Sequence, residues 1–360
     1  MGSMIIRSVT LHVDSVDSLS KGARVLADLS KVIARKGYSV WSRRISLPPI
    51  EDNRELLEIC RAIADLRREL EGLYISAFNF RASTEISIPD LIKCMKGINT
   101  SFSSMLVKGE DDLEEGYKKL SDFYRSSEID LHTRFATTYG SWILTPYFPA
   151  SASIVSETAF TVALRYARDF GDSLSKGSLE MLGEAIENLN RDLEESSGEA
   201  GVGYKGIDLS LSPWMEESVG AVIEDLSGAE IPLPGTIAAI RKVNKIISRD
   251  LVRRARSTGF GEVMLPVEED NVLKERARLG KISLKDLIGY AAFCVAGVDM
   301  AVIPRSRVLS GKTLYNIMED LSQIYQYKQR PIGMRIIIAD GLPGMAINLG
   351  RFGAASIIEI

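Results

Sequence analysis

The chain has 360 residues, of which 45% are hydrophobic and 26% are charged, and its formal net charge is -4. This composition is typical of a globular protein and excludes a disordered chain. The near-neutral charge gives no reason to expect a nucleic acid or an anionic membrane as the main partner.

The cysteines are few and widely spaced. Cys60, Cys94 and Cys294 form no close pair, which excludes a disulfide framework and a cysteine zinc site. The sequence also has no apolar run of the length of a membrane helix, and it does not open on a cleavable leader. We therefore expect a soluble, cytoplasmic protein that binds neither membranes nor nucleic acid.

The first residues and the amide content bear on the source. Met1-Gly2-Ser3 are typical of an expression scar before a native Met4, so we expect one domain over residues 4–360. Glutamine occurs only three times, at Gln323, Gln326 and Gln329, whereas charged residues are plentiful. Scarce amides beside many ion-pairing side chains are typical of heat-adapted proteins, so the composition indicates a thermophilic source.

From Ile5 onward, β-branched runs alternate with helical periods, which predicts an α/β architecture. Pro48-Pro49 ends the second predicted strand, and Asp52 followed by Glu55 predicts a capped helix start. The elements predicted in the first half are, in chain order, a strand over 5–13, a helix over 18–35, a strand over 38–47, a helix from 52 to 72, a strand over 73–80, a short helix after 89, a strand over 102–107, a helix around 113–124 and strands over 133–137 and 159–166, the last two flanking an irregular segment at 146–153.

The second half continues the alternation. A long helix carries an apolar stripe from Leu182 to Leu193, and the acidic, glycine-rich segment 194–203 predicts an exposed turn. Strands over 207–211, 263–267, 298–303 and 332–338 alternate with helices, one of which runs from Ile237 to Arg256, and a hairpin is predicted over 345–358. These elements give about ten strands, and no internal repeat is visible.

Several predicted strands have one polar face. In a doubly wound sheet, helices cover both faces and the strands are apolar throughout. Here Ile207, Leu209 and Leu211 lie on one face, while Asp208 and Ser210 lie on the other, because side chains in a strand have period two. The segments 9–13, 41–47 and 334–338 alternate in the same way. We therefore predict a closed barrel with helices outside and a partly polar interior.

The polar side chains inside such a barrel have two interpretations. In one, they satisfy one another, because buried charge must be paired. In the other, they converge on a cavity whose arginines bind the carboxylate or phosphate of a small anionic metabolite. The candidate residues for this ligand site are His12, Arg44, Arg134, Asp208, Ser210 and Arg335.

A second candidate anion site lies at the start of a predicted helix. Pro234-Gly235-Thr236 opens the helix, whose free amides favour an anion, although Thr236 as a plain N-cap explains the pattern equally well. Basic residues follow along this helix and indicate either a solvated face or an acidic partner, and they are Lys242, Lys245, Arg249, Arg253 and Arg256.

Acidic residues offer a candidate metal site. Glu268, Glu269 and Asp270 follow a predicted strand, and an oxygen-rich magnesium or calcium site would draw on Asp208, Glu268, Asp270 and Asp299. Capping of the helix that starts near Asn271 is the competing explanation. No other cofactor is predicted, because the sequence lacks the Walker and G-x-G-x-x-G patterns.

Several segments resemble one known family. YKGIDLSLSPWMEESVGAVIEDLSG, from Tyr204, resembles the D-L-S-L-A-P strand and D-S-V helix of the DUF711 family, whose members are uncharacterised. Further similar segments, in chain order, are RRISLPPI from Arg43, PGTIAAIRKVN from Pro234, GFGEVMLPVEED from Gly259, CVAGVDMAVIP from Cys294 and the C-terminal NLGRFGAASI. Between Thr145 and Ala167 the chain departs from the family pattern, a difference that would change the ligand preference if this segment lines the site.

The resemblance implies a fold related to the ten-stranded barrel of glycyl radical enzymes, with two antiparallel five-stranded halves. It implies no activity. Arg351-Phe352-Gly353 is similar to the radical loop's Arg-x-x-Gly pattern but one residue short, and the cysteines occupy apolar helix positions that indicate packing. We expect a protein that binds a small anionic metabolite inside the barrel, as an enzyme of unknown reaction or a sensor. The alternative is a structural or regulatory homo-oligomeric barrel, such as a dimer, without catalysis.

Overall fold

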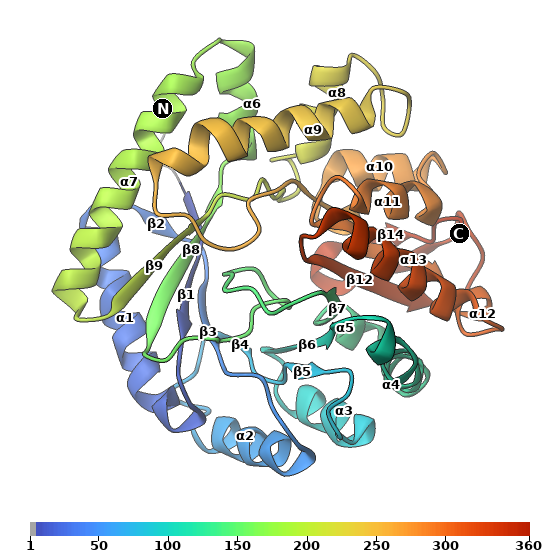
Figure 1. The fold of residues 1–360 in the computed structure, drawn as a ribbon, viewed down its shortest axis with the longest axis horizontal. Coiled ribbons are helices and arrows are strands. Elements are labelled where there is room, and N and C mark those ends of the chain that lie inside the picture. The colour runs from blue at the N-terminus through green and yellow to red at the C-terminus, as the bar shows by residue number, and fades with distance from the viewer. Residues whose placement is uncertain (1–4) are drawn as a thin grey trace.

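The computed structural model describes residues 5–360 and shows an α/β fold, in which helices surround a large mixed sheet (Figure 1). The expected scar at residues 1–3, and Met4 after it, lie outside the described residues. Among residues 5–360, no helix has both the length and the apolar character needed to cross a bilayer.

Most strands lie close to their predicted positions. The strands of the main sheet are β1 (Ile5–His12), β2 (Ser39–Val40), β3 (Arg43–Ser46), β4 (Tyr74–Ser76), β5 (Phe80–Arg81), β6 (Ser101–Val107), β7 (Phe135–Tyr139), β8 (Ala159–Arg165), β9 (Gly203–Asp208), β10 (Met264–Pro266), β11 (Ala296–Pro304) and β12 (Ile332–Ala339). The predicted single strand over 38–47 is two strands, β2 and β3, which pair with β1 in one continuous register on either side of a break at residues 41–42. The predicted C-terminal hairpin is formed by β13 (Ala346–Asn348) and β14 (Ala354–Ser356).

The helices pack outside the sheet (Figure 1). They are α1 (Leu19–Arg35), α2 (Asn53–Asp65), α3 (Ile88–Gly97), α4 (Leu113–Ser126), α5 (Ile129–His132), α6 (Ala167–Ser175), α7 (Leu179–Ala200), α8 (Val219–Ser227), α9 (Thr236–Ile246), α10 (Asn271–Arg278), α11 (Leu284–Ala291), α12 (Arg305–Val308) and α13 (Thr313–Lys328). Asp52 caps α2 as predicted, accepting a hydrogen bond from the Glu55 amide.

Three helix predictions need correction. α2 ends at Asp65, well before Gly72. The exposed turn predicted over 194–203 is wrong, because α7 continues to Ala200 and ends only where Gly201 adopts a left-handed conformation. α9 ends at Ile246 and a π-helical turn over Ile247–Leu251 follows, so the basic residues predicted for one helix are spread over α9, this turn and the residues after it, and all five are exposed.

The sheet follows one long path. Ten strands are hydrogen-bonded in the order β10-β11-β12-β7-β6-β4-β3-β1-β8-β9. Along it, β1, β3, β4, β6 and β7 run parallel to one another, and β8 to β12 run the opposite way, since only the β1–β8 and β7–β12 pairs are antiparallel. Backbone hydrogen bonds also join the two ends of the path: the Leu211 amide donates to the Glu262 carbonyl (3.2 Å), and the Met264 amide donates to the Leu211 carbonyl (3.0 Å).

The connection between β7 and β8 runs through the middle of the molecule rather than over its surface (Figure 1). This internal loop, residues 140–158, contains the irregular segment predicted at 146–153, and Tyr147, Ser151 and Ser153 in it are buried. A buried loop has carbonyls that neither a helix nor a sheet satisfies, so they need other donors.

Side chains on the polar faces of three neighbouring strands supply these donors. The internal loop's Pro146 carbonyl accepts from Thr10 on β1 (3.3 Å) and Arg44 on β3 (3.1 Å), and its Ser151 carbonyl accepts from Ser46 on β3 (3.0 Å). Ser76 on β4 and Asn79 just after it donate to the Pro149 and Ser151 carbonyls. The polar strand faces therefore have a cause that neither sequence interpretation included: they bind the protein's own backbone.

Candidate functional site

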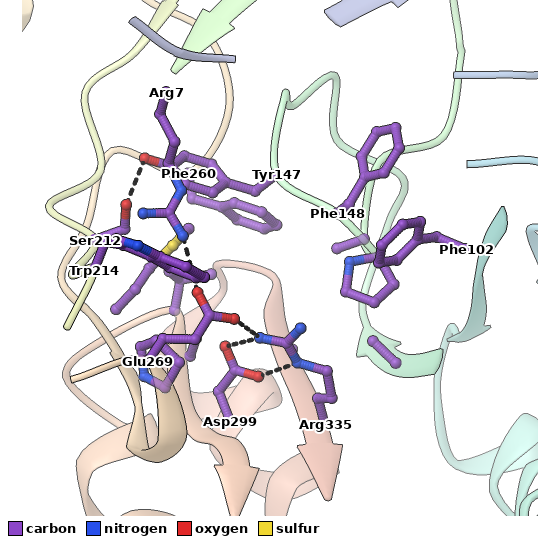
Figure 2. A pocket seen from close by; sticks show the side chains of 18 of the residues that line it. Arg7, Phe102, Tyr147, Phe148, Ser212, Trp214, Phe260, Glu269, Asp299 and Arg335 are labelled. Carbon is purple, nitrogen blue, oxygen red and sulfur yellow. Dashed lines mark hydrogen bonds and ion pairs between the residues drawn. The ribbon is translucent and has the colours of Figure 1, made fainter. Parts of the chain in front are cut away.

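A cavity of about 280 Å³ lies beside the internal loop (Figure 2). The residues that line it come from strands of both directions. β1 and β3 contribute Arg7 and Arg44, and β11 and β12, which run the opposite way, contribute Asp299 and Arg335. Much of the remaining wall is aromatic, formed by Trp41, Tyr74, Phe102, Tyr147, Phe148, Trp214 and Phe260.

One side of the cavity is a chain of ion pairs (Figure 2). Asp299 and Arg335 are directly paired across β11 and β12, and the guanidinium contacts both oxygens of Asp299 (2.6 and 3.1 Å). Arg335 also donates to Glu269 Oε1 (2.9 Å), and Arg7 donates to Glu269 Oε2 (2.8 Å). Two arginines and two carboxylates therefore neutralise one another in a buried line.

The pKa shifts of these groups differ in direction. Burial alone raises the pKa of Glu269, but the charges of Arg335 and Arg7 outweigh it and hold the pKa below its usual value. Burial also raises the pKa of Asp299, and Arg335 does not fully offset this effect. Burial lowers the pKa of Arg335, yet the two carboxylates shift it upward overall. The network thus stabilises the charged forms of Glu269 and Arg335.

Arg44, by contrast, has no carboxylate partner. Its Nε donates to Ser42 (3.1 Å), its Nη1 donates to the Pro146 carbonyl (3.1 Å), and its guanidinium lies 5.1 Å from the centroid of Phe148. Among the described residues, no group hydrogen-bonds to its Nη2. Burial and the nearby positive charge of Arg7 lower the pKa of Arg44 to about 9, as expected for a cation whose charge is not neutralised.

A second arginine without an ion pair stands at the edge of the cavity. Arg351 lies in the short turn Gly350–Phe352, between β13 and β14, and it is exposed. Its guanidinium lies 4.8 Å from the Phe352 ring and 6.0 Å from the Tyr74 ring. The turn is held by Phe352, which packs on Trp214, and by Lys274, which donates to the Phe352 carbonyl.

The structure separates the predicted ligand residues. Arg44 and Arg335 line one cavity as predicted, but Asp208 and Ser210 do not, so the prediction that Asp208 joins them is wrong. Asp208 instead accepts hydrogen bonds from Ser210 (amide and hydroxyl), Thr145, Phe260 and Gly261. Burial raises its pKa despite these bonds. Asp208 therefore anchors the backbone between β9 and β10.

The other predicted ligand residues also lie outside the cavity. His12 is fully buried, contacts Thr161 (2.8 Å) and has a pKa lowered by burial to about 3. Arg134 is occupied by Asp130 and by three backbone carbonyls. Gly235 is the residue before α9, and Thr236 donates to the Leu233 carbonyl, so Thr236 is not the N-cap.

The four predicted metal ligands are not brought together. Asp299 is bound to Arg335, and Asp270 accepts from Ser218 and Gly220 and caps α10, as the competing explanation predicted. Within residues 5–360, no group of three or more His, Cys, Asp or Glu side chains is arranged to hold a metal ion. None of the three cysteines lines the cavity.

Glu268 is a buried carboxylate with few stabilising polar contacts. Within residues 5–360, neither of its oxygens accepts a hydrogen bond of good geometry, Lys274 Nζ lies 3.5 Å away, and burial raises its pKa to about 7.

We expect Glu268→Gln to remove a pH dependence of stability. A raised pKa means that the folded state binds the proton more tightly, so this contribution is complete below the ordinary glutamate pKa and is lost as the pH rises through about 7. Denaturant unfolding at pH 5 and pH 8 measures the difference, which is at most about 3 kcal/mol. Equal pH dependence in parent and variant would show that Glu268 does not titrate in this range.

The sequence reasoning did not place Arg7, Trp41 or Trp214 in the cavity, and it considered Glu269 only among acidic metal or capping candidates and Arg351 only in the radical-loop comparison. Arg7 occupies the register shift of β1, where simple alternation assigns it to the apolar face. Trp41 lies in the break between β2 and β3, where strand alternation does not apply. The available signal for Arg7 was an arginine on the otherwise apolar face of a strand, because an arginine is almost never buried unless it is paired.

Comparison with known proteins agrees with the resemblance seen in the sequence. The family model described as "Uncharacterised ACR (DUF711)" matches residues 125–347. A UPF0210 protein of Pyrobaculum aerophilum is 28% identical over 99% of this chain and 90% of its own length. A UPF0210 protein of Methanopyrus kandleri is 30% identical over 44% of this chain and 36% of its own length.

A solved structure also matches in part. The anaerobic ribonucleotide reductase from Thermotoga maritima, in complex with dATP and CTP, aligns with 98% of this chain and 77% of its own chain, with a TM-score of 0.34 and 11% identity. The family assignment rests on the family model, which covers more than half of the sequence. The chain belongs to the DUF711 family of uncharacterised proteins.

Proposed function

We propose that the cavity binds a small organic anion with a planar, apolar body and one carboxylate or phosphate group. The observation that carries this proposal is Arg44. Its guanidinium faces an aromatic cavity, has no carboxylate partner and keeps one nitrogen free of hydrogen bonds. A guanidinium is the side chain that best matches the geometry of a carboxylate or phosphate.

The charge of the cavity supports this proposal. Arg7, Arg335, Glu269 and Asp299 neutralise one another, which leaves the charges of Arg44 and Arg351 unbalanced on the wall. The aromatic side chains provide flat apolar contacts for the rest of the ligand. A ligand with an anionic group and a flat apolar group would complement the unbalanced arginines and the aromatic side chains of this wall.

We also propose that the sheet forms one closed, ten-stranded barrel of two five-stranded halves, in a single domain. The opposite directions of β1–β7 and β8–β12 support the two halves, and the hydrogen bonds of Leu211 to Glu262 and Met264 support closure. Closure would enclose the internal loop and shield the cavity from water, which strengthens its electrostatic interactions.

Binding of phenyl phosphate to the parent and to Arg44→Ala, measured by calorimetry, tests the proposed function. We expect the variant to bind about 10- to 100-fold more weakly, the value of one charge-assisted hydrogen bond. Arg43→Ala is the matched control, because Arg43 lies next to Arg44 on β3 and does not line the cavity.

Phenol and inorganic phosphate serve as partial probes, and each should bind more weakly than phenyl phosphate. If phenyl phosphate does not bind the parent, or if Arg43→Ala and Arg44→Ala lose affinity equally, the proposal is wrong. Failure of every anion to bind would favour the structural or regulatory alternative.

A further inference from the structure

We propose that the ligand continues beyond this cavity, past Arg351, into a second cavity where an uncharged, hydroxyl-bearing part of it binds. This inference rests on the proposed function and extends it, because it names the chemistry of the ligand's far end. The second cavity has a volume of about 340 Å³. Tyr74, Phe102 and Arg351 line both cavities, so the two share a wall.

The shared wall carries a cation that is not ion-paired within residues 5–360. Arg351 is the charged group common to both cavities, it is exposed, and no carboxylate pairs with it. Its guanidinium is placed by the rings of Phe352 and Tyr74 rather than by an ion pair. An acidic group of a ligand at this point would be within reach of a free guanidinium, with an aromatic body on one side and the second cavity on the other.

The chemistry of the second cavity differs from that of the first. Apart from Arg351, its charged groups are Arg134 and Asp130, which are bound to each other (2.8 Å), and the remaining guanidinium nitrogen of Arg134 donates to backbone carbonyls. A second acidic group of the ligand would therefore have no unpaired cation to bind beyond Arg351 in the second cavity. Asn99 and Asn348 line this cavity and are exposed, and side-chain amides donate to and accept from hydroxyl groups, although the Asn348 oxygen also accepts from the Gly350 amide (3.0 Å).

These observations indicate a specific ligand class. The ligand would have an aromatic or flat apolar group in the first cavity, a singly charged linking group such as a phosphodiester held by Arg44 and Arg351, which both line that cavity, and a short polyhydroxyl group in the second cavity. The hydroxyls, rather than a second charge, would distinguish this ligand from simpler aromatic anions.

Two diesters with the same charge test the proposal. Methyl phenyl phosphate fills the first cavity and the junction, and glyceryl phenyl phosphate adds two hydroxyls that reach the second cavity. We expect the parent to bind the glyceryl ester about tenfold more tightly than the methyl ester, a ratio that corresponds to about 1.4 kcal/mol. Arg351→Ala should weaken both esters by a similar factor.

Asn99→Trp places a large ring at the rim of the second cavity and should abolish the preference for the glyceryl ester while leaving the affinity for the methyl ester unchanged. Asn188→Trp, at an exposed position on α7, is the matched control and should retain the preference. If the two esters bind the parent equally, or if Asn99→Trp keeps the preference, the second cavity is not a subsite, even where phenyl phosphate binds. If phenyl phosphate itself does not bind, the proposed function has failed instead.

Discussion

Replacing Arg335 with alanine is expected to destabilise the protein by about 3 to 5 kcal/mol, the usual cost of removing one partner from a buried ion pair. The guanidinium contacts both Asp299 and Glu269, and its side chain is only 8% exposed. Without it, two carboxylates remain buried close together, with Arg7 contacting only Glu269. Urea unfolding followed by circular dichroism measures the loss.

The pH dependence of this loss identifies its cause. In the parent, the lowered pKa of Glu269 means that its contribution to stability is present above the ordinary glutamate pKa and disappears as the pH falls. In Arg335→Ala the buried carboxylates would have raised pKa values, so the variant gains relative stability on protonation. The difference between parent and variant should therefore be largest near pH 8 and smaller near pH 5.

Arg330→Ala is the control for this experiment. Arg330 also contacts a carboxylate, that of Glu262 at 3.3 Å, but its side chain is 51% exposed. Glu262 is buried but keeps its ion pair with Lys328 (2.6 Å) when Arg330 is removed, so loss of this exposed cation should cost less than about 1 kcal/mol. A similar cost for the two variants, or a cost for Arg335→Ala that does not change with pH, would contradict a stabilising role for the buried network.

Gly259→Ala is expected to cost about 3 to 5 kcal/mol, because backbone strain and a collision act together. Gly259 has a φ of +72°, and a Cβ atom there would lie 1.9 Å from Oδ2 of Asp208. Asp208 would have to move, which would disrupt its hydrogen bonds to Thr145, Phe260 and Gly261. Thermal and urea unfolding of the variant measure the effect.

Gly261→Ala provides a close comparison. Gly261 has a similar φ of +62°, but a Cβ atom there meets no other atom within 4 Å, so we expect only the backbone cost of about 1 kcal/mol. In an Asp208→Ala background, Gly259→Ala should cost less, because the colliding carboxylate is absent and only the Cβ at position 208, 2.9 Å from the added methyl carbon, remains in close contact. Equal costs for Gly259→Ala in both backgrounds would exclude the collision with Asp208 as the cause.

Local patterns in the sequence predicted much of the fold. The α/β alternation, the Asp52 cap and most strand positions depend on hydrophobic spacing and on turn residues, which are local properties. One failure occurred where an extra residue in a strand changes the pattern. Period-two alternation assigns Arg7 to the face of Val9, but the register shift between Ile6 and Ser8 places it beside Arg44 in the cavity wall.

The site was predicted only in part for a different reason. Period-two alternation indicated the polar strand faces, and Arg44 and Arg335 both line one cavity as predicted. The same alternation could not distinguish Asp208, which does not line that cavity, from these two arginines. Whether a polar side chain faces a cavity or a buried carbonyl depends on where the internal loop runs. That path is fixed by contacts between residues more than 100 positions apart, such as Ser46 with Ser151, and no local pattern reports it.

The internal loop has a consequence for hydrogen exchange. Amides outside regular secondary structure usually exchange quickly, because loops open without disturbing the rest of the molecule. Here the Tyr147 amide donates to Thr145, and the Ser153 amide donates to the Leu47 carbonyl, both within the packed interior. Opening this loop would separate it from β1, β3 and β4 at once. Its amides should therefore exchange as slowly as those of the central strands, and the loop would behave as part of the most stable cooperative unit.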